Sequence, residues 1–174
     1  TASKYMGGHS DIVAGVVAGS AEHIQSICQN ERELLGACMD PHQAWLLIRG
    51  LRTLPVRLKA HGEAGLKMAK YLEQHPCVSQ VFYPGLDSHP QKELVDKYLK
   101  GGLNGLIGFV YDGTAEQARE FMYSLKMFQY GVSWGGFESL VAPGSVGLTD
   151  EEAAAIGMPA NVVRIHIGLE DVDT

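Results

Sequence analysis

The sequence predicts an α/β fold. Strand-like and helix-like segments alternate along the whole chain, which is the pattern of domains built from layered sheets and helices. A chain of 174 residues with 45% hydrophobic and 20% charged residues can bury a substantial core. Neither an internal repeat nor a low-complexity linker interrupts the alternation. We therefore expect one domain or parts of two.

The first third of the chain predicts a strand followed by helices. Residues 11–20, DIVAGVVAGS, are apolar and rich in Val and Gly, which is typical of a buried strand. Ser20 is expected to cap a helix after this strand, and Asp40 with Pro41 to begin another. Residues 50–55 then interrupt the helical pattern, because Gly and Pro disfavour helix interiors. This interruption is the best candidate for a domain boundary.

A second, amphipathic helix is predicted from about Leu54. Leu58, Leu66 and Leu72 fall near one stripe, as a helix on the surface of a layered fold requires. Arg57 is expected among the charged residues that lie mostly on the other, solvated side.

The rest of the chain alternates strands and helices. Residues 78–85 alternate as a strand does, 89–102 contain a short helix, and 102–113 are typical of a central strand. Thr114 is expected to cap a helix over 114–127, followed by a strand in 128–135. In the final strand, 161–170, Val163, Ile165 and Ile167 form an apolar face, while Arg164 and His166 lie on the opposite face.

Composition excludes several classes of function. The formal net charge of −6 and the lack of a basic patch argue against nucleic acid as a partner. No apolar run approaches the roughly 18 to 20 residues of a membrane span. The three cysteines lack a C-x-x-C spacing, which predicts reduced thiols and a cytoplasmic location. The histidines are scattered, so no metal site is predicted.

Lys4 is the candidate reactive residue. Lysines are mostly exposed, so considered alone Lys4 is far more often a surface charge than a catalytic group. A lysine that bonds covalently to an aldehyde must lose its proton part of the time, which requires a partly desolvated site. The segment TASKYMGG fits this requirement, because the hydroxyls of Thr1 and Ser3 can donate to phosphate oxygens just before the apolar run.

Four segments carry a family resemblance: SKYMGGHSD (3–11), LLGACMDPHQAWLLIRGLRTLPVR (34–57), VSWGGFESL (132–140) and RIHIGLEDVD (164–173). In this order they resemble the Cys/Met-metabolism family of pyridoxal-phosphate (PLP) enzymes of transsulfuration. The resemblance implies the type I PLP-dependent transferase fold, with PLP as cofactor and assembly as a dimer of dimers. It also implies that residues 1–53 end the large PLP-binding domain and that residues 54–174 form the small C-terminal α/β domain, truncated at its end.

The resemblance also implies roles for individual residues. Lys4 matches the lysine that holds the cofactor and acts as a base, and Thr1 and Ser3 match positions that contact the phosphate. Arg164 matches the arginine that binds the substrate α-carboxylate, with Ser133 helping to orient it. Without the resemblance, Arg164 would more often be a surface residue paired with Glu170 or Asp171, and Ser133 a polar strand end. Structural roles are expected for Tyr5, His9 and Asp11.

Trp134 is the specificity marker within this resemblance. The segment SWGGFESL is similar to the bacterial cystathionine β-lyase version, which implies β-elimination from cystathionine or a related thioether amino acid. A core tryptophan is the plain alternative. The alternative reaction is elimination or replacement at Cγ, as in cystathionine γ-synthase, γ-lyase or sulfhydrylase relatives.

A hypothesis of a different class is that the chain is an inactive module. The family's other cofactor contacts, which precede the lysine, are missing from this sequence, so we expect it to be truncated at both ends. Without a carboxylate beside the pyridine nitrogen, the cofactor would withdraw electrons poorly. A bound chromophore on Lys4 after adding PLP would favour the enzyme.

Overall fold

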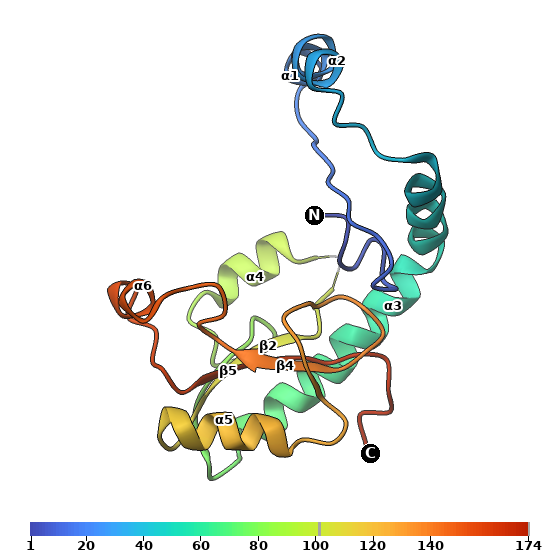
Figure 1. Ribbon diagram of the computed structural model, residues 1–174. Helices are drawn as coiled ribbons and strands as arrows, with labels where there is room; N and C mark the ends of the chain where they lie inside the picture. The colour runs from blue at the N-terminus through green and yellow to red at the C-terminus, as the bar shows by residue number, and fades with distance from the viewer. Residues whose placement is uncertain (101, 174) are drawn as a thin grey trace.

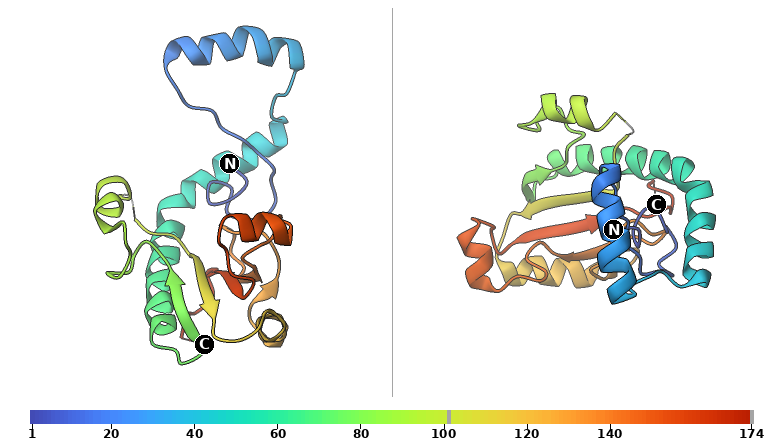
Figure 2. Two further views of the ribbon diagram at one scale, coloured as in Figure 1. Left: turned by 90° about the vertical axis from the view of Figure 1, so that its left-hand side faces the viewer. Right: turned by 90° about the horizontal axis from the view of Figure 1, so that it is seen from above.

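The structure is a computed structural model that describes residues 1–100 and 102–173. It confirms the α/β fold, with a mixed five-stranded sheet of strand order β1-β2-β5-β4-β3 and helices around it (Figures 1 and 2). The elements are α1 (Ala21–Ile27), the π-helical turn η1 (Cys28–Arg32), α2 (Glu33–Leu35), α3 (Pro41–Glu73), β1 (Val78–Phe82), α4 (Lys92–Tyr98), β2 (Leu106–Tyr111), α5 (Ala115–Ser124), β3 (Gln129–Tyr130), β4 (Leu140–Pro143), α6 (Asp150–Ala155) and β5 (Val162–His166).

The two faces of the sheet have different partners. Ile107 of β2 and Ile165 of β5 are paired in the ladder and belong to the core, together with Leu72 of α3 and Met122 of α5. Side chains alternate between the faces of a strand, so Arg164 and His166 lie on the face opposite Ile165. The face that bears Ile165 is therefore buried against α3 and α5, while His166 on the other face contacts Tyr5 of the N-terminal turn and also His61 of α3.

Helix α3 is continuous, so the predicted break at residues 50–55 is wrong. Asp40 caps the helix by accepting from the main-chain N–H groups of His42 and Gln43, as expected. Pro55 lies inside the helix, which is bent in Figures 1 and 2. A proline removes one helical hydrogen bond and crowds the preceding turn, so it bends a helix that packing holds together on both sides. The division at residues 53 and 54 stays a prediction.

The predicted buried strand at residues 11–20 is wrong. This segment is extended but pairs with no strand among the residues that the structure describes, and Val13 is 85% exposed. It leads to the α1–α2 segment, which projects away from the sheet (Figure 1). Ser20 does cap α1, by accepting from the N–H of His23. An apolar sequence indicates that a segment favours burial, but the burial itself requires a ladder partner.

The later elements follow the sequence closely. Strands β1, β2 and β5 and helices α4 and α5 fall inside the predicted ranges, and Thr114 caps α5 with a reciprocal contact to Gln117. The strand predicted in 128–135 is shorter, since β3 contains only Gln129 and Tyr130. Helix α6 was not anticipated. The three cysteines are free thiols.

Candidate functional site

Lys4 contacts residues that lie far away in the sequence. It is half-buried in a turn near the N-terminus, and its Nζ donates to Ser133 Oγ at 3.0 Å. The same Nζ lies 4.4 Å from the centre of the Trp134 ring, within the range of a cation–π contact. Ser133 and Trp134 belong to the loop between β3 and β4. The fold therefore joins the predicted reactive lysine to this loop.

Arg164 reaches the same indole from β5. Its Cζ lies 5.6 Å from the Trp134 ring centre, and its Nη2 donates to the carbonyl of Val132 at 2.6 Å. Burial lowers the pKa of Arg164 from its usual value, but a guanidinium stays charged at neutral pH. The surface pairing with Glu170 is not seen, because Glu170 instead accepts from the N–H and hydroxyl of Ser139, at 2.9 and 2.8 Å.

The site thus combines an amine, a guanidinium, a hydroxyl and an aromatic ring. Lys4, Ser133, Trp134 and Arg164 come together in the structure. Two cationic groups next to one ring favour a ligand that carries negative charge. A guanidinium presents a planar fork that matches a carboxylate, so the arrangement is suited to an amino acid.

Thr1 and Ser3 lie on the same short segment but make different contacts. Ser3 Oγ accepts from the N–H of Ala14 at 2.8 Å and donates to the carbonyl of Ala14 at 3.2 Å. Thr1 is exposed, and its Oγ1 accepts from the N–H of Ser3 at 3.3 Å. The Ser3 hydroxyl therefore fastens the segment to Ala14, whereas Thr1 presents its hydroxyl to solvent.

Arg57 of α3 holds the Lys4 turn in place. It is only 6% exposed, so its predicted position on the solvated side of the helix is wrong. Its Nη1 donates to the carbonyl of Tyr5 at 2.8 Å, its Nη2 to that of Gly50 at 2.8 Å, and its Nε to Thr53 Oγ1 at 3.0 Å. Burial lowers the pKa of Arg57. Helix periodicity could not reveal this, because the burying group is a loop from elsewhere in the sequence.

A buried cluster of rings lies next to this turn. Tyr5 meets His61 of α3 and His166 of β5 at ring-centre distances of 5.3 and 5.8 Å. The hydroxyl of Tyr5 accepts from the N–H of Gly105 at 3.1 Å, which agrees with its expected structural role. His9 likewise contacts its own turn, through Nδ1 and the carbonyl of Gly7 at 2.8 Å. Sequence reasoning missed His61 completely.

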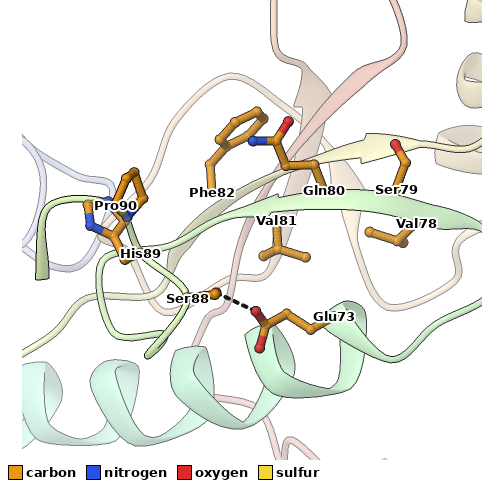
Figure 3. A pocket seen from close by; sticks show the side chains of 9 residues that line it. All are labelled: Glu73, Val78, Ser79, Gln80, Val81, Phe82, Ser88, His89 and Pro90. Atoms are coloured by element: carbon orange, nitrogen blue, oxygen red, sulfur yellow. Dashed lines mark hydrogen bonds between the residues drawn. The ribbon is translucent and has the colours of Figure 1, made fainter.

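A separate pocket of about 370 Å³ lies beside the edge strand β1 (Figure 3). The end of α3 and residues 88–90 complete its walls, and Ser88 donates to Glu73 across it. None of the predicted site residues lines this pocket. Within residues 1–100 and 102–173, no group of three or more His, Cys, Asp and Glu could hold a metal ion. Over the same residues, no helix has the length and apolar character that a membrane crossing requires.

The chain is similar to proteins of known family. The family model for "Cys/Met metabolism PLP-dependent enzyme" matches residues 1–174. "Probable cystathionine gamma-synthase 2" of Arabidopsis thaliana is 42% identical over 176 residues, which cover 99% of this chain and 42% of that protein. "Cystathionine gamma-lyase" of Sus scrofa is 41% identical over 177 residues, covering 98% and 43%. "Cystathionine gamma-synthase 1, chloroplastic" of Arabidopsis thaliana is 38% identical over 177 residues, covering 99% and 31%.

These matches bear on the sequence-based predictions in two ways. They confirm the family resemblance over the whole chain. The predicted special similarity to bacterial β-lyases finds no support, because these three relatives are two γ-synthases and a γ-lyase. The chain spans less than half the length of these relatives.

Proposed function

Because the chain belongs to the Cys/Met metabolism PLP-dependent enzyme family, we propose that the full-length protein makes or breaks a carbon–sulfur bond at Cγ of an amino acid. The single observation that supports Cγ chemistry is that the relatives, at 42% and 41% identity, are a probable γ-synthase and a γ-lyase. Membership of the family implies PLP as cofactor.

The residues of the site fit PLP. Lys4 offers a half-buried primary amine, the group that bonds to an aldehyde, and a hydroxyl and an aromatic ring lie beside it. We assign Lys4 as the residue that holds the cofactor and Thr1 as a phosphate contact. Ser3 is assigned as a second phosphate contact, which would share its hydroxyl with Ala14. When bound, PLP supplies an electron sink for negative charge at the substrate Cα.

The chain's own residues would then orient the substrate and move its proton. Arg164 binds the α-carboxylate through its guanidinium fork, and Ser133 orients the same carboxylate. Lys4 Nζ takes the proton from the substrate Cα once the amine is free, acting as a general base. Trp134 covers Lys4 and limits the access of water, since its ring lies 4.4 Å from Nζ.

A second candidate is elimination at Cβ. Trp134 supports it, because the segment SWGGFESL resembles the bacterial cystathionine β-lyase version and its indole lies 4.4 Å from Lys4 Nζ. A bulky ring at this position would limit the length of the substrate side chain, and so determine whether the carbon–sulfur bond breaks at Cβ or at Cγ.

The products of cystathionine cleavage separate the two reactions. The full-length protein, loaded with PLP, is incubated with cystathionine. Cleavage at Cγ yields cysteine, 2-oxobutanoate and ammonia, whereas cleavage at Cβ yields homocysteine, pyruvate and ammonia. A γ-synthase that only joins a thiol amino acid to an activated homoserine would give neither keto acid from cystathionine. Incubated instead with those two substrates, it would release the activating group. Cleavage at Cβ would reject the proposal in favour of the second candidate.

The hypothesis of an inactive module is tested on the 174-residue chain itself. If the chain holds PLP on Lys4, the mixture absorbs at a wavelength distinct from free PLP, and borohydride fixes the cofactor to the protein. Without binding, this chain alone is a module of the larger protein.

The full-length protein is further proposed to be a cytoplasmic homo-oligomer with a small amino acid as substrate and without nucleic-acid or membrane partners. One relative is chloroplastic, so location needs its own measurement.

A further inference from the structure

The rings of His61 and His166 lie directly against each other beneath the site. Their centres are 5.2 Å apart, and both side chains are buried, at 0% and 1% exposure. Each ring also contacts Tyr5, the residue after Lys4. Nothing in the proposed chemistry uses either histidine, so their buried nitrogens require a separate explanation.

The main chain fixes the tautomer of His166. The N–H of Gly135 donates to His166 Nε2 at 3.0 Å, so Nε2 carries a lone pair. The carbonyl of Gly136 lies farther from the same atom, at 3.3 Å, and can only accept. A neutral ring with an unprotonated Nε2 carries its proton on Nδ1. Within the described part of the chain, His166 Nδ1 has no partner.

The main chain also fixes the tautomer of His61. Its Nδ1 lies 2.9 Å from the carbonyl of Ile167, which accepts a hydrogen bond and cannot donate one. His61 therefore carries its proton on Nδ1, and its Nε2 is an acceptor. Over residues 1–100 and 102–173, this Nε2 contacts no donor. Burial lowers the pKa of both histidines, which keeps both rings neutral at pH 7.

The two atoms without partners are thus complementary, since one is a donor and the other an acceptor. We propose that His166 Nδ1–H is hydrogen-bonded to His61 Nε2, directly after a small ring rotation or through one water molecule, and that this pair positions the Lys4 site. The resulting chain of hydrogen bonds runs from Gly135 through His166 and His61 to Ile167. It ties the loop that bears Ser133 and Trp134 to both α3 and β5.

Gly135 is the point where this pair acts on the site. It adopts a φ of +81° directly after Trp134, and a Cβ on it would lie 2.6 Å from Tyr5 N and 2.9 Å from Lys4 C. The main chain of Gly135 is therefore packed against that of Lys4. A change in the hydrogen bond from Gly135 to His166 alters the spacing between Lys4 and the loop. His61 and His166 are positioning residues, because they act through the main chain and not on the reacting atoms.

Nitrogen NMR tests the tautomers without reference to any activity. The full chain is labelled with ¹⁵N-histidine, and the ring signals are assigned by their loss in H61N and H166Q. We expect both rings to be protonated at Nδ1 and unprotonated at Nε2 at pH 7. A ring protonated at Nε2, or on both nitrogens, overturns the proposal. This measurement holds even if the protein proves to have no carbon–sulfur chemistry.

Matched variants of the PLP-loaded full-length protein test the positioning role, which rests on the proposed function. Gln at position 166 places its side-chain amide near the position of Nε2, so its oxygen can still accept from the N–H of Gly135. Asn places its shorter side-chain amide near the position of Nδ1 and leaves the N–H of Gly135 without this acceptor. We expect H166N to lower kcat about tenfold to a hundredfold with KM changed less than about threefold, because a small misplacement of reacting groups has an effect of that size. H166Q should recover most of that loss.

His61→Asn completes the test. It keeps a donor for Ile167 but removes the acceptor for His166, so we expect a loss of kcat smaller than that of H166N. Equal losses in H166N and H166Q would overturn the assignment of Nε2 as the functional acceptor, and full activity in H166N would overturn the positioning role. Should a variant fail to fold, the tautomers of the unmodified protein still test whether the two histidines are complementary donor and acceptor.

Discussion

Lys4 is the single residue on which the proposed chemistry depends most. Replacing it with arginine keeps a cation that can contact Trp134 but removes the amine that bonds to an aldehyde. We expect Lys4→Arg to lower turnover of the full-length protein by more than about a thousandfold, as loss of a covalent group does. Keto-acid release measures the effect. Lys59→Arg, on the exposed side of α3, is the control, and substantial turnover in K4R would contradict the role.

Arg164 is expected to act on binding more than on turnover. Lysine at this position keeps the charge but loses the fork that pairs with a carboxylate. We predict that Arg164→Lys raises KM for the amino acid by roughly tenfold to a hundredfold, with a smaller change in kcat. Steady-state kinetics measures both constants, and exposed Arg119→Lys serves as the matched control. An unchanged KM would mean that another group binds the carboxylate.

His166 makes stability depend on pH. Burial lowers its pKa to about 4, with the neighbouring His61 acting in the same direction and Glu138 and Glu170 in the opposite one. The unfolded ring has a pKa near 6.5, so between about pH 6.5 and 4 the unfolded chain binds a proton that the folded chain does not. The contribution to the free energy of unfolding is complete above this window and is lost as pH falls through it.

The expected loss is up to about 3 kcal/mol, since each pH unit between the two pKa values is worth about 1.4 kcal/mol. Urea unfolding at pH 7, 5.5 and 4.5 measures it. His166→Gln does not titrate in this window, so its unfolding free energy should fall less steeply, while the remaining titrating groups, including His61, contribute to both proteins. Identical pH profiles would show that His166 protonates freely in the folded state.

Among the elements, α3 connects the sheet to the Lys4 turn, and Gly50 is the point of closest approach. A Cβ at this position would meet the carbonyl oxygen of Gly7 and would lie 2.6 Å from that of Met6. Main-chain atoms cannot move aside as a flexible side chain can. We therefore expect Gly50→Ala to lower the free energy of unfolding by about 1–3 kcal/mol, although alanine favours a helix over glycine by about 1 kcal/mol.

Chemical denaturation measures this change. Gly15→Ala is the control, because a Cβ on Gly15 meets no atom within 4 Å. A stabilised G50A protein would show that helix propensity outweighs the contact and that the Lys4 turn moves aside easily.

The elements also show where sequence patterns succeed. Caps were predictable, because Ser20, Asp40 and Thr114 each accept a hydrogen bond from the first turn that follows. The same signal marks α6, where Thr149 and Glu152 form a capping box that was overlooked. Proline was misleading, since Pro55 bends α3 without ending it. Local signals therefore fix where helices begin better than where they stop.

For the molecule as a whole, the candidate site was predictable through motifs and not through spacing. Lys4 and Ser133 are 129 positions apart in the sequence, and in the structure Lys4 Nζ lies 3.0 Å from Ser133 Oγ. Before the structure, only the family resemblance could connect the two residues. The burial of Arg57 and His61 was not predicted, because residues far away in the sequence bury them: the Lys4 turn covers Arg57, and Tyr5 and His166 pack against His61. The segment at residues 11–20, where Val13 is 85% exposed, was wrongly predicted as a buried strand, because its own sequence cannot show whether another strand lies beside it.

The two tryptophans give the protein an internal optical reporter. Trp45 is 57% exposed on α3, whereas Trp134 is stacked near the ammonium of Lys4 and the guanidinium of Arg164. Indole emission responds to nearby charge, so a ligand that neutralises or displaces either cation should change the fluorescence of Trp134 and leave that of Trp45 constant. With Trp45 replaced by phenylalanine, a fluorimeter could follow the occupation of the site in real time.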